Sequence, residues 1–393
     1  MRDFVSKAIR GIPPSGIRKF FDIASEMGDV ISLGVGEPDF ATPDNIRDAA
    51  ILSMQKKGTK YTSNAGMPEL RAEIARYMHS QYQLSYNPDT QVLVTVGASE
   101  GIDIAMRAIA DPGDEVLVVE PCFVSYKPCV QMAGGVPVPV TTSAANNFRV
   151  TPDEIEAKLT SKTKAIIISY PSNPTGAIME RADLEKIAAV IRERDIVCIS
   201  DEIYSELTYA DGDHVSIASL PGMYERTVVL SGFSKAFAMT GWRLGYACGP
   251  RDILAAMTKI HQYIIMCAPT TAQYGGLEAL RGGAGGVADM RKEYDERRRF
   301  MLDGFEKIGI DCFEAKGAFY LFPSISRFGM TSEGFCAKLL REKRLAVIPG
   351  NAFGDCGEGH IRCSYAYSMD NLEEALSRLG EFIAGLTEKG AGK

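Results

Sequence analysis

The chain alternates between short apolar runs of strand length and segments whose apolar residues recur with helical spacing. Helical periodicity is clear at 102–110 and 184–193. The strand-length runs are residues 92–96, 116–119, 136–140, 165–169, 196–200, 228–231 and 244–248. Alternation of this kind is typical of a parallel sheet covered by helices. We therefore predict an α/β fold with a mostly parallel seven-stranded sheet and helices on both faces.

Glycine-rich punctuation predicts the boundaries of this unit. Residues 282–286 read Gly-Gly-Ala-Gly-Gly, a composition typical of a flexible break. Beyond it, a charged helical segment at 287–308 precedes a mixture of short strands (318–322, 345–348) and helices (332–341, 371–385), which predicts a smaller α+β domain. We expect an N-terminal arm at 1–45 that joins this small domain, a large domain at 46–281 and the small domain at 282–393.

Composition and charge exclude several classes of function. A net charge of −7 and a pI near 5.4 argue against binding to nucleic acid or to an anionic membrane. The nine cysteines form no C-x-x-C pair and the four histidines are isolated, so we expect reduced thiols and no metal site. The sequence shows no signal-peptide pattern and no membrane-spanning apolar run, so we expect a cytoplasmic protein.

Residues 227–249 combine a buried-strand pattern with an isolated lysine. Lys235 and Arg243 are the charged residues of this stretch, which contains no carboxylate. A lysine just beyond a buried strand is partly desolvated, which lowers its pKa and frees the amine to attack a carbonyl. The ordinary alternative is a lysine whose stem lies along the edge of the core. The rest of the chain has to supply the partners of such an amine.

Candidate partners follow the other predicted strands. Functional groups collect at the carboxyl ends of parallel strands. Segments 97–99, 121–123, 170–176 and 201–204 follow strands in this way. Each has an ordinary role in isolation, as a helix cap, a core residue or a turn. Together they supply a helix start beside Arg243 for a phosphate, a carboxylate for a pyridine nitrogen, an aromatic ring to cover a heterocycle, and an amide and a phenol for a ring oxygen. This set describes pyridoxal phosphate.

Several motifs carry a resemblance to a known family. They are the segment 231–237 around Lys235, Gly-Trp-Arg at 241–243, Asn-Pro-Thr-Gly at 173–176, Asp-Glu-x-Tyr at 201–204 and Ile-Arg-x-Ser at 361–364. Together they resemble the fold-type I, class I/II aminotransferases that depend on pyridoxal phosphate, and more narrowly the aspartate/aromatic subgroup. The similarity runs from about Ser15 to about Leu379. Segments 14–20, 34–40, 61–71, 233–246 and 317–320 look closest to the bacillar aminotransferase of N-acetyl-diaminopimelate synthesis.

The resemblance implies a role for each residue around the cofactor ring. Lys235 is the residue that binds the aldehyde through an imine and later moves the proton. Asp201 pairs with the ring nitrogen. Tyr204 and Asn173 bind the ring oxygen, and Phe123 stacks on the ring. Lys235, Asp201 and Tyr204 are accordingly the expected catalytic residues.

The phosphate and substrate sites are implied in the same way. The residues expected to hold the phosphate are Gly97, Ala98, Ser99, Ser234 and Arg243. The residues expected to bind the substrate carboxylate are Gly36, Asn173 and Arg362. Relatives often have Ser or Asn where this chain has Gly232, so one phosphate donor is absent there.

The family also implies features beyond a single site. Tyr61 is expected to reach the phosphate of the neighbouring subunit, which predicts an obligatory homodimer. Cis peptide bonds are expected before Pro121 and Pro174.

These features predict a transaminase that moves an amino group from an L-amino acid to a 2-oxo acid such as 2-oxoglutarate. The donor is aromatic, aspartate-like or of the N-acyl-diaminopimelate type. No second arginine is evident for a side-chain carboxylate, and the apolar segment 263–268 favours aromatic, aliphatic or acylated side chains. A C–S β-lyase would use the same Lys235, Asp201 and Arg362. A ligand-binding regulator would carry a basic helix-turn-helix, which this chain lacks ahead of the arm.

Overall fold

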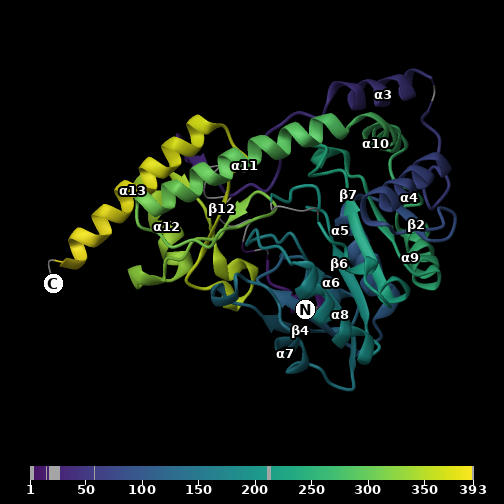
Figure 1. Ribbon diagram of the computed structural model, residues 1–393, viewed down its shortest axis with the longest axis horizontal. Helices are drawn as coiled ribbons and strands as arrows, with labels where there is room; N and C mark the ends of the chain where they lie inside the picture. The colour runs from purple at the N-terminus through teal and green to yellow at the C-terminus, as the bar shows by residue number, and fades with distance from the viewer. Residues whose placement is uncertain (1–3, 15, 17–26, 57, 210–213, 392–393) are drawn as a thin grey trace.

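A seven-stranded sheet forms the centre of the protein (Figure 1). The computed structural model describes residues 4–14, 16, 27–56, 58–209 and 214–391. The strands, in spatial order, are β2 (Val92–Thr95), β8 (Gly245–Cys248), β7 (Thr227–Gly232), β6 (Val197–Asp201), β5 (Thr163–Ser169), β3 (Glu115–Glu120) and β4 (Val136–Thr141). Strand β8 runs antiparallel to both of its neighbours, and the other pairs are parallel. The predicted fold class and all seven predicted strands are confirmed.

Helices cover both faces of this sheet because its central strands are apolar on both sides. Val116 and Val118 of β3 belong to one core cluster, which also contains apolar residues of α5 (Gly97–Ile109) and α9 (Arg251–Ile264). Leu117 and Val119 belong to another, which contains apolar residues of α8 (Arg181–Glu193). The alternation along one strand thus places its side chains in two separate cores.

Other helices complete this part of the chain. They are α3 (Asp44–Gln55), α4 (Pro68–Tyr82), α6 (Tyr126–Met132), α7 (Pro152–Glu156) and α10 (Thr270–Gly282). Helix α10 packs against α3 and α4, beyond the β2 edge of the sheet (Figure 1). Short 3-10 helices lie at 144–146, 217–219, 224–226, 240–242, 326–328, 350–353 and 355–357.

The C-terminal part has smaller sheets of its own. Strands β11 (Ile348–Pro349), β12 (Ile361–Ser364) and β9 (Tyr320–Leu321) form an antiparallel sheet in that order. Strand β1 (Ile31–Ser32) pairs in parallel with β10 (Leu345–Ala346), so residues close to the N-terminus lie against this part. The helices are α11 (Ala284–Lys307), α12 (Ser332–Lys343) and α13 (Met369–Ala391), and α11 runs from α10 to α12 and α13 (Figure 1).

The expected flexible break at 282–286 is wrong. Helix α10 ends at Gly282 and α11 begins at Ala284, so Gly283 alone lies between them. A Cβ atom on Gly283 would lie 3.0 Å from the Phe237 ring, so a larger residue would be crowded at this position. The division into an arm and two domains stays a prediction.

The N-terminal arm is described in part. Helix α1 (Lys7–Arg10) lies near its start, whereas most of the segment 14–20 that carries the family resemblance lies outside the described residues. Within the described ranges, no helix is long and apolar enough to cross a membrane.

Candidate active site

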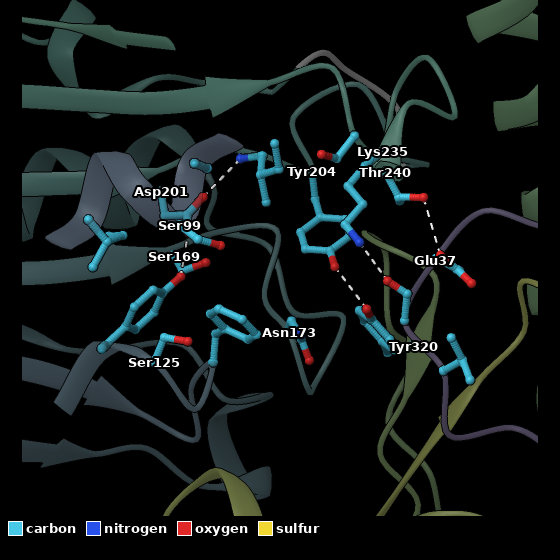
Figure 2. A pocket seen from close by; sticks show the side chains of 18 of the residues that line it. Glu37, Ser99, Ser125, Ser169, Asn173, Asp201, Tyr204, Lys235, Thr240 and Tyr320 are labelled. Carbon is cyan, nitrogen blue, oxygen red and sulfur yellow. Dashed lines mark hydrogen bonds between the residues drawn. The ribbon is translucent and has the colours of Figure 1, made fainter. Parts of the chain in front are cut away.

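A cavity of about 370 Å³ lies at the carboxyl ends of the central strands (Figure 2). The predicted site residues that line it are Gly36, Ala98, Ser99, Phe123, Asn173, Asp201, Tyr204, Ser234, Lys235, Arg243 and Arg362. Residues from both ends of the chain and from several strands therefore meet at one point. Gly97 and Tyr61 are the predicted residues that do not line this cavity.

Lys235 follows β7 and extends into the cavity. Its Nζ donates a hydrogen bond to the carbonyl oxygen of Gly36 at 2.5 Å (Figure 2). Nζ lies 5.7 Å from the centre of the Tyr204 ring and 5.6 Å from that of Phe319. Burial lowers the pKa of Lys235 to about 8, and the positive charge of Arg362 acts in the same direction. The neutral amine, which is the form that attacks a carbonyl, is thus a larger fraction near neutral pH than in an ordinary lysine.

Asp201 is the last residue of β6 and is buried. Its Oδ2 accepts a hydrogen bond of 2.7 Å from the Tyr126 hydroxyl, and its Oδ1 accepts one of 3.2 Å from the Ile203 backbone (Figure 2). Burial raises the pKa of the Asp201 carboxyl, and the bond from Tyr126 opposes this rise. A buried carboxylate held by two donors is suited to keep a proton on a facing basic nitrogen.

The start of α5 and Arg243 form an anion-binding corner. Gly97 has a φ of +76°, and a Cβ atom there would lie 2.8 Å from Nη2 of Arg243. Glycine therefore lets the guanidinium approach the turn. No side chain of the described residues caps this end of α5, which leaves backbone N–H groups and the positive end of the helix dipole open to an anion. Ala98, Ser99 and Ser234 line the cavity beside them.

Arg362 of β12 forms the opposite wall and is buried. Its Nη1 donates to Oδ1 of Asn173 at 2.8 Å, and its Nη2 donates to the carbonyl oxygen of Gly34. The Arg362 Nε is buried without a hydrogen-bond partner among the described residues. Since a guanidinium carries five N–H donors, several remain for a ligand. A carboxylate satisfies such a buried donor set in a fixed orientation.

Tyr320 joins this arginine to Tyr204. The Arg362 guanidinium lies 4.6 Å from the centre of the Tyr320 ring, and the Tyr320 and Tyr204 hydroxyls are 2.8 Å apart (Figure 2). A Cβ atom on Gly36 would clash with the Tyr320 hydroxyl. The glycine is therefore required where the arm passes over this ring.

Sequence reasoning missed the two tyrosines that hydrogen-bond to Asp201 and Tyr204 in the cavity. Tyr126 lies three residues beyond the 121–123 segment that follows β3, and Tyr320 lies in a short strand of the other sheet. A tyrosine shortly after a strand end and the Gly-Ala-Phe-Tyr segment at 317–320 were the available signals. The expected cis peptide bonds before Pro121 and Pro174 are present, and a further one precedes Pro171.

Phe123 lines the cavity, and its ring packs edge-on against the Tyr126 ring, with 5.8 Å between the two ring centres. Tyr61 lies elsewhere, with 82% of its surface exposed. Nearby, Nδ2 of Asn64 donates to the carbonyl oxygen of Met266 at 2.8 Å, which holds the Tyr61 segment against the loop after α9.

The chemistry of this cavity fits pyridoxal phosphate. The anion-binding corner fits a phosphate, the buried Asp201 carboxylate fits a protonated ring nitrogen, and Lys235 supplies a neutral amine for an aldehyde. The orphan Nε of Arg362 fits the carboxylate of an amino acid. The fold and the site together fit the class of enzymes that act on amino acids with the help of such a group.

Comparison with known proteins identifies the family. The model of the family "Aminotransferase class I and II" matches residues 28–379. The YugH protein of Bacillus subtilis is 53% identical over 383 residues, covering 98% of this chain and 99% of its own. An aspartate aminotransferase of Pyrococcus abyssi is 46% identical, covering 95% and 96%. The chain belongs to the class I and II aminotransferase family.

A solved structure and a further relative place the chain in the aspartate/aromatic subgroup. The aromatic aminotransferase of Pyrococcus horikoshii superimposes with a TM-score of 0.90 at 43% identity, covering 93% of this chain and 99% of its own. The B. subtilis protein named for N-acetyl-LL-diaminopimelate is 41% identical, covering 98% of this chain and 96% of its own. This identity is lower than that of YugH or of the P. abyssi enzyme.

Proposed function

We propose that this aminotransferase holds pyridoxal phosphate in the cavity around Lys235 and moves the amino group of an L-amino acid to a 2-oxo acid. The observation that supports the proposal best is the convergence of a lysine of lowered pKa, a buried carboxylate and a buried arginine with an unpartnered donor. Gly97, Ala98, Ser99, Ser234 and Arg243 would hold the phosphate. Asn173 and Tyr204 would face the ring oxygen, and Phe123 would cover the ring.

The residues divide the work in the reaction. Pyridoxal phosphate supplies an aldehyde for the amino group and a ring that withdraws electrons when it is protonated. Asp201 keeps a proton on the ring nitrogen, because a buried carboxylate is best stabilised by a facing cation. Lys235 holds and moves the substrate proton through its Nζ, whose lowered pKa suits it to act as a base. Arg362 orients the substrate through its α-carboxylate.

Substrate choice follows from the charges around the cavity. Among the described residues, the arginines that line the cavity are Arg243 and Arg362. Arg243 would bind the phosphate and Arg362 the α-carboxylate, so neither is left for a side-chain carboxylate. An aromatic, aspartate-like or N-acyl-diaminopimelate type donor with 2-oxoglutarate as acceptor is proposed, in keeping with the names of the relatives. A panel of amino donors against 2-oxoglutarate tests this. We expect aromatic or acylated donors to be preferred, and much faster turnover of aspartate than of all these would overturn the preference.

The cofactor proposal has a spectroscopic test. The protein reconstituted with pyridoxal phosphate should absorb in the visible range, and borohydride should fix the cofactor to Lys235, as peptide mapping would show. The Lys235→Ala variant should bind the cofactor without a borohydride-stable link. A colourless reconstituted protein, or attachment to another lysine, would contradict the proposal.

We also propose that the enzyme works as a homodimer in which Tyr61 reaches the partner's phosphate. Support comes from the exposure of Tyr61 and from the exposed apolar side chains of Tyr263, Ile264 and Met266 beside it. A monomer would leave this surface in water. Mixing Lys235→Ala with Tyr61→Phe protein should restore activity, because one site of each hybrid has both native residues. If a mixture shown to contain hybrid dimers is no more active than either variant alone, the proposed role of Tyr61 across the interface is contradicted.

A further inference from the structure

The turn from β2 into α5 is held by a glutamate of the helix itself. Val96 precedes the helix, and its side chain has no oxygen to accept from the N–H groups of Ala98 and Ser99. Glu100, four residues after Val96, bonds back to the turn instead, because its Oε2 accepts a hydrogen bond of 2.6 Å from the Val96 backbone. Glu100 therefore fixes the turn while the donors that a serine cap would use remain open to a ligand.

The other oxygen of Glu100 is bound by a buried histidine. Oε1 of Glu100 lies 2.7 Å from Nδ1 of His261, whose side chain is 0% exposed. Because an ionised carboxylate only accepts hydrogen bonds, Nδ1 is the donor. The His261 Nε2 is buried without a hydrogen-bond partner among the described residues, so the bond to Glu100 is the one that the ring makes there.

His261 is itself held in place. It lies near the end of α9, which packs against α5. Its carbonyl oxygen accepts hydrogen bonds from the backbones of Ile265 at 3.0 Å and Met266 at 3.3 Å. Glu100 is thus fixed between the turn and a neighbouring helix. Without this partner, its negative charge would be free to approach a phosphate bound at the same helix end, where like charges repel.

We propose that Glu100 and His261 are positioning residues that hold the backbone of residues 96–99 in the shape that binds the cofactor phosphate. This inference rests on the proposed function. Neither side chain lines the cavity, so both act through the backbone rather than by touching the cofactor. The pair should therefore affect ligands that carry a phosphate and leave those without one unaffected.

The test compares two ligands of the apoenzyme, pyridoxal phosphate and pyridoxal, by absorbance titration. Glu100→Ala should lower the affinity for pyridoxal phosphate about 10- to 100-fold, which is the scale of a lost buried charge-assisted hydrogen bond. The affinity for pyridoxal should stay unchanged. His261→Leu should act in the same direction. The double variant should be little worse than either, because the two residues act as one unit. Glu100→Gln should keep most of the affinity, since its amide oxygen can accept from Val96 while its NH2 group donates to Nδ1 of the His261 tautomer that is protonated at Nε2.

Asp103→Ala is the matched control. Asp103 is a carboxylate of the same helix that binds Nε of Arg107 at 2.8 Å and does not reach the turn, so both affinities should stay unchanged. The inference is overturned if Glu100→Ala binds pyridoxal phosphate like the native protein, or loses both ligands equally. If the native apoenzyme binds neither pyridoxal phosphate nor pyridoxal, the proposed function itself is contradicted, and this inference with it.

Discussion

Replacing Arg362 by lysine tests the substrate site most directly. The guanidinium bonds Asn173 and Gly34 and lies 4.6 Å from the Tyr320 ring centre and 4.8 Å from that of Phe353. A lysine keeps the charge but cannot make these bonds and face a carboxylate at the same time. We therefore expect Arg362→Lys to bind every substrate carboxylate in a poorly fixed orientation.

The size of the effect follows from these contacts. One lost charge-assisted hydrogen bond costs roughly 1.5–3 kcal/mol, and the lost ring contacts add about 0.5–2 kcal/mol. A total of about 2–5 kcal/mol corresponds to a fall in kcat/KM of roughly 30- to 4000-fold, because 1.4 kcal/mol is tenfold.

The assay is steady-state kinetics of each half-reaction, with an amino acid and with a 2-oxo acid. A primary amine without a carboxylate serves as an internal control and should react equally well with both proteins. Arg327→Lys is the matched variant, since Arg327 lies 4.7 Å from the Phe328 ring centre but outside the cavity. If kcat/KM of Arg362→Lys for amino acids stays within about threefold of the native value, or if the amine is affected equally, Arg362 does not read the carboxylate.

Further predictions concern the remaining residues of the cavity. Asp201→Ala should lose most of the turnover while still binding cofactor, because the ring nitrogen loses its proton; near-normal turnover would refute this role. Covalent capture of pyridoxal phosphate by the apoenzyme should accelerate as pH rises through about 8, because the Lys235 amine then loses its proton; stopped-flow absorbance at several pH values would show it. A rate that is flat across this range would contradict the lowered pKa. Gly36→Ala should raise KM for amino acids, because a Cβ there clashes with the Tyr320 hydroxyl, and Tyr320→Phe added to it should recover part of the loss; no recovery would mean that the clash lies elsewhere.

The large sheet could be predicted because each strand is a run of apolar residues buried on both faces. Leu117 and Val118 point to different cores, yet both have to be apolar, which leaves a strong signal in the sequence. The direction of β8 carries no such signal, since an apolar run reads the same in either orientation. The strands β9 to β12 are two to four residues long, too short for periodicity to define all of them.

The predicted break at 282–286 failed because glycine is tolerated at helix ends when packing compensates. Each glycine inside a helix costs about 1 kcal/mol relative to alanine, but here a Cβ on Gly283 would crowd Phe237. The close approach of the Phe237 ring and of the Ala279 carbonyl oxygen, rather than flexibility, explains this glycine.

The site was predictable where chemistry follows a strand end directly, as at Asp201 and Lys235. Tyr126 and Tyr320 were missed because their contacts with Asp201 and Tyr204 come from tertiary packing. The same holds for Glu100 and His261, which are 161 positions apart in the chain. Spacing along the sequence does not reveal such pairs.

The hydrogen bond between Arg362 and Asn173 joins the small antiparallel sheet to the loop beyond β5. In the proposed function, the carboxylate common to all amino acids would thus be bound at buried residues, where a substitution would damage folding and chemistry together. The side chains that distinguish amino acids would then be recognised by more exposed residues of the cavity, such as Glu37. Substrate specificity could therefore change through a few residues at the cavity entrance while the residues around Lys235 stay the same.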